Sequence, residues 1–326
     1  MSDALLEVKK LITAFDTDAG LLRAVDQVSF RVNRRQTVGI VGESGCGKSV
    51  TAMSIVKLLP QPSGRILEGE ILFKNRNLVT TSSEEMRRIR GNEIGVIFQE
   101  PMTALNPVHR IGKQLSECFI LHKGMSKKEA WDASIEMLKL VRIPAPVSRI
   151  GEYPHQLSGG MRQRIVIALA LACKPDLIIA DEPTTALDVT VQAQILDLIK
   201  EQQEQLGTSM ILITHDLGVI AETCDEVVVM YGGRVVERGP VHEIFHQPRH
   251  AYTRGLLASM PHLDSPRKTA LPVIPGMVAA LQDFVSGCRF CQRMNRAGST
   301  LRDRSALIEI SPNHWVEACP LCVESL

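Results

Sequence analysis

Four short apolar runs punctuate the chain from its N-terminus to about residue 245, and longer stretches with helical spacing lie between them. Each run is apolar along nearly its whole length, which is typical of a strand covered on both faces. Such strands, alternating with helices, predict an α/β fold with a mostly parallel sheet. The runs are Thr37–Val41, Ile94–Phe98, Leu177–Ala180 and Met210–Thr214.

A polar or glycine-rich element follows each run directly: Gly42–Ser49, Gln99, the pair Asp181-Glu182, and His215. In a parallel sheet the C-terminal ends of the strands lie at one edge, and ligands bind at that edge. We therefore expect these four elements, which are distant in the sequence, to meet in one site.

The strand pattern disappears after Gln99. Apolar residues from Trp131 to Val141 recur at helical spacing instead. This predicts a helical subdomain at about residues 100–155, inserted into a first domain that spans residues 1–260.

Two features follow in the last hundred residues. The apolar segments Glu226–Tyr231 and Arg234–Glu237 are joined by Gly232-Gly233, which predicts a β-hairpin. Prolines then recur from residue 261 onward. That tail is interpreted as a linker into a small C-terminal module within residues 261–326.

Composition narrows the class of protein. Apolar residues make up 44% and charged residues 22% of the 326 residues, as in ordinary globular proteins. The net charge of +1 lacks the basic excess of a dedicated nucleic-acid binder, so no nucleic-acid partner is expected. No apolar run approaches the roughly 20 residues of a membrane helix, and the N-terminus lacks a signal-peptide pattern. We expect a cytosolic chain with any membrane role mediated by partners.

The octapeptide after the first strand fits the pattern G-x-x-x-x-G-K-[ST]. Its glycines allow backbone N–H groups to surround phosphate oxygens, Lys48 places a positive charge against them, and the Ser49 hydroxyl can bind Mg²⁺. The sequence therefore predicts an ATP site. Its residues are Gly42, Glu43, Ser44, Gly45, Cys46, Gly47, Lys48 and Ser49.

The third strand runs into two carboxylates. Asp181 can hold Mg²⁺, directly or through water, and Glu182 lies where it could orient or deprotonate an attacking water. Both would serve ATP hydrolysis. A solvated pair of carboxylates in a turn is the structural alternative.

A second helix start suited to phosphate follows Leu157. Ser158 can cap the helix, while Gly159 and Gly160 leave backbone N–H groups available to an anion. One phosphate loop with two such helix starts is unusual in a self-contained ATPase, but it is natural where two chains share nucleotides.

Taken together, these elements resemble an ATPase subunit of an ABC transporter over about residues 5–260. The resemblance implies a head-to-tail dimer that holds ATP between the phosphate loop of one subunit and the Ser-Gly-Gly segment of the other. It also implies that Gln99 contacts Mg²⁺ or water, that His215 binds the γ-phosphate, and that Asp188 couples the two sites. Glu182, His215 and Gln99 are then the catalytic residues. The Mg²⁺ ligands are Ser49, Gln99 and Asp181.

The family also stacks an aromatic residue on adenine before the first motif. Phe15 is the candidate in this chain, and a core phenylalanine is the alternative reading. Met161 stands where the family often has Gln, which should be tolerable because the backbone does the binding.

Three segments carry a narrower resemblance, to the ATPase subunits of dipeptide and oligopeptide importers and especially to their D-type subunit. They are Pro101–Pro107, Tyr153–Gln156 and His250–Thr253. This implies a second, non-identical ATPase, two membrane permease subunits, an extracytoplasmic binding protein, and a place on the cytoplasmic face of the membrane. Nickel and sugar importers of the same subfamily are alternatives. A soluble ABC ATPase of repair or translation fits less well, because the chain has one cassette and no heptad run.

The eight cysteines fall into two groups. Cys46, Cys118, Cys173 and Cys224 are scattered and are expected to be buried small apolar residues. The other four lie in the last 39 residues as two C-x-x-C pairs, Cys288 with Cys291 and Cys319 with Cys322.

Paired thiols at this spacing suit Zn²⁺ or an iron–sulfur cluster, and bare thiols are a third reading. The peptide-importer resemblance implies a [4Fe–4S] cluster, although only Cys288 and Cys319 fall at the family's positions. His314 is a further candidate ligand, for which a surface position is the simpler expectation. A structural staple is expected here rather than a redox centre.

Overall fold

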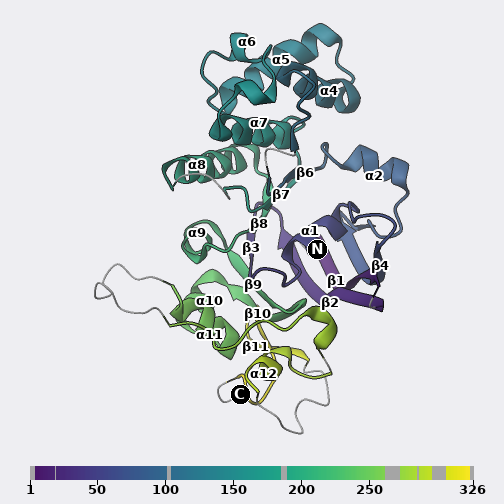
Figure 1. Ribbon diagram of the computed structural model, residues 1–326. Helices are drawn as coiled ribbons and strands as arrows, with labels where there is room; N and C mark the ends of the chain where they lie inside the picture. Colours follow the sequence, from purple (N-terminus) through teal and green to yellow (C-terminus); the bar gives the residue numbers. More distant parts are fainter. Residues whose placement is uncertain are drawn as a thin grey trace. The chain divides into compact units, whose positions relative to one another are not determined.

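The computed structural model describes residues 4–18, 20–100, 104–184, 189–260, 272–284, 286–295 and 306–323. The chain folds into two compact units (Figure 1). The first unit comprises Met1–Leu5, Val32–Gln36 and Thr80–Ile213. The second unit comprises Leu6–Arg31, Thr37–Val79 and Thr214–Leu326. The division into domains of residues 1–260 and 261–326 stays a prediction.

Three parallel strands form the centre of the first unit. β7 (Leu177–Asp181) pairs with β6 (Ile94–Ile97) on one side and with β8 (Ser209–Ile213) on the other. Every residue of β7 and β8 is buried. The continuous apolar runs therefore predicted these strands correctly, with ends that differ by one residue.

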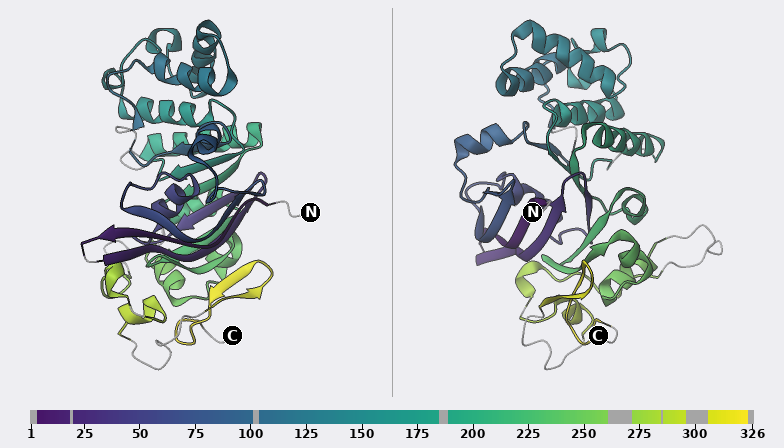
Figure 2. Two further views of the ribbon diagram at one scale, coloured as in Figure 1. Left: turned by 90° about the vertical axis from the view of Figure 1, so that its right-hand side faces the viewer. Right: turned by 180° about the vertical axis from the view of Figure 1, so that it is seen from behind.

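Helices make up most of the rest of the first unit. The segment between β6 and β7 forms no regular strand in the part that the structure describes, in agreement with the predicted helical insertion. Its helices lie together beside α7 in both views of Figure 2. The helical elements are α2 (Ser83–Ile89), α4 (Ile111–Lys123), α5 (Lys127–Leu140), α6 (Pro146–Arg149), η1 (Pro154–Gln156), α7 (Gly159–Leu171) and α8 (Val189–Leu206).

Close contact between α4 and α5 depends on a small residue. A Cβ at Gly112 would lie 2.5 Å from the ring of Trp131, so only glycine allows this approach without rearrangement. A capping box at Ser126, completed by Glu129, starts α5 at a defined residue. The insertion is thus a packed pair of helices.

An antiparallel sheet, most of which belongs to the second unit, was not predicted. Its strand order is β2-β1-β4-β5. The alternating pattern of these strands is weak, because β1 and β2 carry several buried residues in a row. The strands are β1 (Ala4–Thr17), β2 (Gly20–Asn33), β4 (Gly64–Phe73) and β5 (Arg76–Asn77).

The second unit also contains five strands in the order β11-β12-β10-β9-β3. β3 and β9 are parallel, and the other pairs are antiparallel. β9 and β10 form the predicted hairpin, whereas β11 and β12 had no clear signal in the sequence. The strands are β3 (Thr37–Val41), β9 (Glu226–Tyr231), β10 (Arg234–Pro240), β11 (Leu307–Ser311) and β12 (His314–Glu317).

Short helices complete the second unit, and an aromatic cluster joins its C-terminal part to β9. The rings of Tyr231, Tyr252 and Phe290 lie with centroids 4.6–5.5 Å apart. The C-terminal residues therefore pack on the sheet that carries the phosphate loop. The helices are α1 (Lys48–Ile55), α9 (Leu217–Thr223), α10 (Val241–His246), α11 (Ala251–Ala258), η2 (Leu281–Asp283) and α12 (Arg289–Arg293).

Candidate functional site

The phosphate loop lies between β3 and α1, as its motif requires. Gly42, Gly45 and Gly47 all have positive φ, and a Cβ at Gly42 would lie 2.2 Å from the carbonyl oxygen of Met230. Glycine is needed at that position both for its conformation and for space. The turn directs the chain into α1, whose N-terminus favours an anion.

Lys48 is the first residue of α1 and is buried. Its Nζ donates to the carbonyl oxygen of Gly42 at 2.8 Å and to that of Glu43 at 3.1 Å. The ammonium group is therefore held inside the loop, where a phosphate oxygen would meet it. Cys46 is buried, and that burial raises the pKa of its thiol, so it is a packing residue of the loop.

Contacts from α11, from α12 and from the turn between β9 and β10 hold the loop from outside, and the sequence did not predict them. The backbone N–H of Glu43 donates to the Tyr252 hydroxyl at 2.9 Å. The Glu43 carboxylate accepts from the Arg293 guanidinium at 2.6 Å. The carbonyl oxygen of Cys46 accepts from the N–H of Gly233 at 3.0 Å. No local sequence motif predicts these partners, because they lie some two hundred positions away in the chain.

The first unit brings two of the predicted catalytic side chains together. The Gln99 amide Nε2 donates to Glu182 Oε2 at 3.0 Å. Glu182 follows β7 with a φ of 47°, in the left-handed region that side-chain-bearing residues seldom adopt. Its N–H donates to the carbonyl oxygen of Ile213 at 2.8 Å, which holds the turn in place. Asp181 ends β7 and is buried.

The predicted second helix start also lies in the first unit. Ser158 is the N-cap of α7, and its hydroxyl accepts from the N–H of Met161 at 3.4 Å. Gly159 and Gly160 form the first turn. The buried Gln163, one turn further along, donates to the carbonyl oxygen of Pro183 at 2.5 Å. This bond links α7 to the turn that carries Glu182, and the sequence analysis missed it.

The remaining predicted residues are spread over both units. Phe15 is half-buried on β1 beside Gly64, and Ser49 is the second residue of α1. His215 is exposed just before α9. Asp188 lies outside the described residues, as does the start of the Pro101–Pro107 segment. The meeting of the phosphate loop with Gln99, Asp181, Glu182 and His215 in one site stays a prediction.

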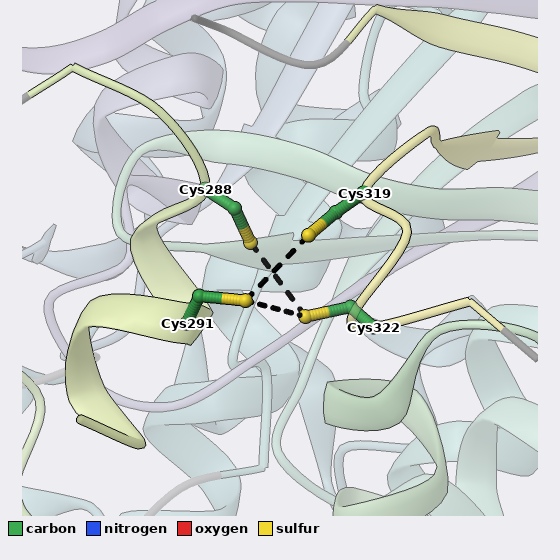
Figure 3. A group of neighbouring side chains, drawn as sticks. All are labelled: Cys288, Cys291, Cys319 and Cys322. Carbon is green, nitrogen blue, oxygen red and sulfur yellow. Dashed lines mark hydrogen bonds between the residues drawn. The ribbon is translucent and has the colours of Figure 1, made fainter. Parts of the chain in front are cut away.

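The four paired cysteines meet in the second unit (Figure 3). Their sulfurs all lie within 4.8 Å of one another and point to a common centre. Each of the four residues is at most 1% exposed. Cys288 and Cys291 come from the start of α12, and Cys319 and Cys322 come from the turn after β12. This confirms that the two pairs belong together, and it leaves the identity of a bound metal open.

Hydrogen bonds favour a thiolate at one of these residues. The pKa of Cys288 is lowered to about 3, mainly because the Cys322 thiol donates a hydrogen bond to its sulfur. Burial opposes this shift, and His250 and the N–H of Cys291 add to it. Burial and the charge of Cys288 raise the pKa of Cys291 to about 12. Repulsion between thiolates this close means that only a cation would allow all four to be charged.

The expected surface position of His314 is wrong. His314 is 1% exposed, and its Nε2 donates to Glu237 Oε1 at 2.8 Å. The carboxylate of Glu237, itself fully buried, also accepts from the backbone N–H groups of Arg249 and His250. His314 is therefore a structural partner of Glu237 and no part of the cysteine group. Of the scattered cysteines, Cys118 is half-buried and the other three are buried.

Two family models match this chain. One, described as ABC transporter, matches residues 25–185. The other, described as Oligopeptide/dipeptide transporter, C-terminal region, matches residues 236–299.

Relatives match along almost the full length. The chain is 54% identical to the dipeptide transport ATP-binding protein DppD of Bacillus subtilis, over 97% of this chain and 95% of that protein. It is 50% identical to the oligopeptide transport ATP-binding protein OppD of the same organism, over 96% and 88%. It is also 50% identical to the probable peptide ABC transporter ATP-binding protein y4tR of Sinorhizobium fredii, over 96% and 94%.

Solved structures agree with these matches. One is a dimeric post-hydrolysis state of the ATP-binding cassette MJ0796 bound to ADP and Pi, with a TM-score of 0.65 and 28% identity over 72% of this chain and 98% of that chain. Another is cbiO1 from Clostridium perfringens, part of the ABC transporter complex cbiONQ, with a TM-score of 0.63 and 27% identity over 76% and 92%. The protein is thus a nucleotide-binding cassette. The chain belongs to the ABC transporter family, as one of its ATP-hydrolysing subunits.

Among the residues that the structure describes, no helix is long and apolar enough to cross a membrane.

Proposed function

We propose that this chain hydrolyses ATP to power the import of peptides. The observation that carries the proposal is its 50–54% identity, over nearly the whole chain, to proteins named as peptide, oligopeptide and dipeptide transport ATP-binding proteins. The match of residues 236–299 to the oligopeptide/dipeptide transporter C-terminal region supports the same cargo class.

The phosphate loop binds the ATP phosphates, and Lys48 supplies the positive charge at the β- and γ-phosphates. Support comes from the loop geometry, in which Lys48 Nζ is held by the carbonyl oxygens of Gly42 and Glu43. Phe15 stacks on the adenine. His215 binds the γ-phosphate.

Glu182 activates the attacking water, and Gln99 positions it. The hydrogen bond between their side chains supports this pairing. Since Gln99 Nε2 donates to Glu182, its Oε1 is the atom left to bind Mg²⁺ or water. Ser49 and Asp181 would be the other Mg²⁺ ligands, and the ion would neutralise charge on the phosphate oxygens.

Each ATP lies between two ATPase subunits. The phosphate loop of one subunit faces the Ser158, Gly159 and Gly160 segment of the other, and Asp188 couples the two sites. Ser158 as the N-cap of α7 supports this role, since a capped helix start offers N–H groups to a phosphate. The chain on its own should therefore hydrolyse ATP slowly. Robust turnover by a strictly monomeric preparation would contradict the shared site.

The subunits work on the cytoplasmic face of the membrane. We propose a second ATPase, a paralogue of this chain, and two transmembrane permeases as direct partners, with an extracytoplasmic binding protein acting indirectly. No nucleic-acid partner is proposed. Closure of the ATPase dimer on ATP would drive the permeases, and hydrolysis would reopen it.

Replacement of DppD in Bacillus subtilis tests the cargo. A strain that lacks DppD and expresses this chain should regain growth on a dipeptide as the sole source of a required amino acid. The same strain with Lys48→Ala should fail to grow, which ties rescue to ATP binding. Failure of the wild-type chain, in a strain where it is present and co-purifies with the remaining ATPase, would argue against peptide as the cargo. Rescue of nickel or oligosaccharide uptake in equivalent strains would favour those alternatives.

A further inference from the structure

The distances within the four-cysteine group discriminate between kinds of metal centre. Cys288 Sγ lies 3.7 Å from Cys322 Sγ, and Cys291 Sγ lies 3.5 Å from Cys319 Sγ and 3.3 Å from Cys322 Sγ. No pair of the four sulfurs exceeds 4.8 Å. The group is therefore compact in all directions.

A single tetrahedral metal ion accounts for this spacing. Zinc–thiolate bonds are about 2.3 Å long, so sulfurs at the corners of such a tetrahedron lie about 3.8 Å apart. The observed distances lie close to that value. One small ion at the common centre of Figure 3 would meet all four sulfurs with little movement.

An iron–sulfur cluster does not fit the same cage. In a [4Fe–4S] cluster each cysteine binds a different iron atom, which places the four cysteine sulfurs about 6 Å apart. A [2Fe–2S] cluster also needs about 6 Å between cysteines on different irons. A [4Fe–4S] cluster would require all four sulfurs to move apart, and a [2Fe–2S] cluster would require two pairs of sulfurs to separate, although all four residues are buried. The spacing of the four sulfurs therefore favours one ion over the cluster that the family resemblance implied.

The backbone around each pair supports thiolate ligands. The N–H of Cys291 donates to Cys288 Sγ, and the N–H of Leu321 donates to Cys319 Sγ. In both pairs the backbone thus stabilises the first sulfur. Such donors are the outer contacts that orient metal ligands and tune their charge.

His250 provides a further contact to one ligand. Its Nδ1 accepts from the N–H of Tyr252 at 3.2 Å, so the ring proton is on Nε2. Nε2 makes no hydrogen bond and lies 3.9 Å from Glu317 Oε2, and the ring lies within 4.8 Å of Cys288 Sγ. A buried donor facing Cys288 favours the thiolate form there.

We propose that Cys288, Cys291, Cys319 and Cys322 bind one Zn²⁺ in a closed tetrahedral site. Four protein thiolates leave no open coordination position, so the ion is structural. The ion would link α12 to the turn after β12 and thereby stabilise the C-terminal module.

Metal analysis of the full-length chain tests this proposal. Protein purified anaerobically from cells supplied with both iron and zinc should contain one zinc per chain, no acid-labile sulfide and no brown colour. Cys291→Ser should lower the zinc content at least tenfold. Cys118→Ser, which changes a half-buried cysteine outside the group, should keep one zinc per chain.

Cobalt replacement provides an independent readout that does not depend on folding of a cysteine variant. Wild-type protein exchanged with Co²⁺ should show the intense visible bands of tetrahedral cobalt with four thiolates. Four irons and four sulfides per chain would overturn the proposal, and so would one iron per chain. A chain that holds no metal and gives no tetrahedral cobalt spectrum would overturn it as well.

A second inference concerns Arg293 in the same helix, and it rests on the proposed ATP site. The side chain is 3% exposed, and its guanidinium donates to the carbonyl oxygens of Ile274, Pro275 and Gly276. Its remaining nitrogen, Nη1, donates to the Glu43 carboxylate at 2.6 Å. A residue of the C-terminal module thus holds the second residue of the phosphate loop.

We infer that Arg293 is a positioning residue for the phosphate loop. A planar guanidinium can satisfy four acceptors at once, whereas an ammonium group cannot. Arg293→Ala should raise the KM for ATP about fivefold with a smaller change in kcat, since a charged hydrogen bond that orders the loop is lost. Arg293→Lys should recover part of the effect.

A double-mutant cycle separates positioning from general stability. Arg293→Ala and Glu43→Gln should each raise KM, and the double variant should be no worse than the more affected single one. Lys139→Ala, which breaks an exposed ion pair with Glu136 on α5, is the control and should leave KM unchanged. Additive effects, or a lower Tm with an unchanged KM, would overturn the inference. A failure of the ATP site itself would show separately, as unchanged ATP binding in Lys48→Ala.

Discussion

The phosphate loop and the four-cysteine group both belong to the second unit, and each brings several potential ligand atoms close together. The loop does so within eight consecutive residues, Gly42–Ser49, through backbone groups and the Lys48 side chain. The cysteine group uses side-chain sulfurs from two segments, with Cys291 and Cys319 28 positions apart. A contiguous site is built as soon as its own turn forms. A divided site requires the surrounding sheet and helices to form first.

This difference predicts which substitutions each region should tolerate. The loop needs glycine at Gly42 and Gly47, where a Cβ would clash with a backbone oxygen, and it needs the Lys48 side chain for its charge. The cysteine group needs all four of its side chains. The two regions are also joined, because α12 carries both Cys291 and the Arg293 that holds Glu43.

The largest effect should come from the first unit and leave both regions intact. Glu182→Gln should lower the turnover of ATP in the assembled transporter by about 10²–10⁴-fold, because an amide cannot accept the proton of the attacking water. ATP binding should persist, since the phosphate loop is unchanged. Single-turnover hydrolysis and nucleotide binding, measured on the same preparation, check this. Normal hydrolysis by the variant would remove Glu182 from its proposed role.

Lys48→Ala should separate the two regions of the second unit. Loss of the ammonium group removes charged hydrogen bonds to the phosphates, so ATP affinity should fall by about 10–100-fold. Metal content should stay at one ion per chain, because the cysteine group does not depend on the loop. Fluorescent-nucleotide titration and metal analysis give the two readouts. A joint loss of metal and ATP binding would mean that the regions fold together.

Removal of the metal should destabilise the four-cysteine group before it affects the phosphate loop. Stripping the proposed zinc with a chelator under reducing conditions should lower Tm by about 10 °C, since a loss of several kcal/mol shifts Tm by about 2–4 °C per kcal/mol in a chain of this size. Thermal unfolding with and without added Zn²⁺ measures the shift. Chelated Cys291→Ser, which already lacks the metal, should show no additional change. A wild-type Tm that is insensitive to the chelator would contradict a structural ion.

The smallest expected effect is a pH dependence of stability that arises where β10 pairs with β12. Burial would raise the pKa of Glu237, but hydrogen bonds from His314 and from the backbone N–H groups of Arg249 and His250 outweigh burial and lower it. A carboxyl whose folded pKa lies below its unfolded value stabilises the protein above that unfolded value, near pH 4.3, and loses this contribution as the pH falls through its folded pKa. The stability of wild type should therefore fall more steeply below about pH 4.3 than that of Glu237→Gln. Urea midpoints at two acidic pH values compare the slopes, and equal slopes would contradict the assignment.

The sequence by itself determined the strands and the motifs that are local. β3, β6, β7 and β8 were evident because a strand buried on both faces must be apolar throughout. The phosphate loop and the cap at Ser158 were evident for a similar reason, since both depend on residues within a few positions of one another. The hairpin at Gly232-Gly233 belongs to the same class.

Only the tertiary structure decided what depends on partners distant in the chain. The antiparallel sheet gave no clean alternation, because several consecutive residues of β1 and β2 are buried. The burial of His314 depends on Glu237, 77 positions away, and the anchoring of Glu43 depends on Tyr252 and Arg293. The close approach of the four cysteines likewise depends on how β12 and α12 pack. Spacing along the chain limits which residues can meet, but packing sets the distances between them, and those distances determine the chemistry.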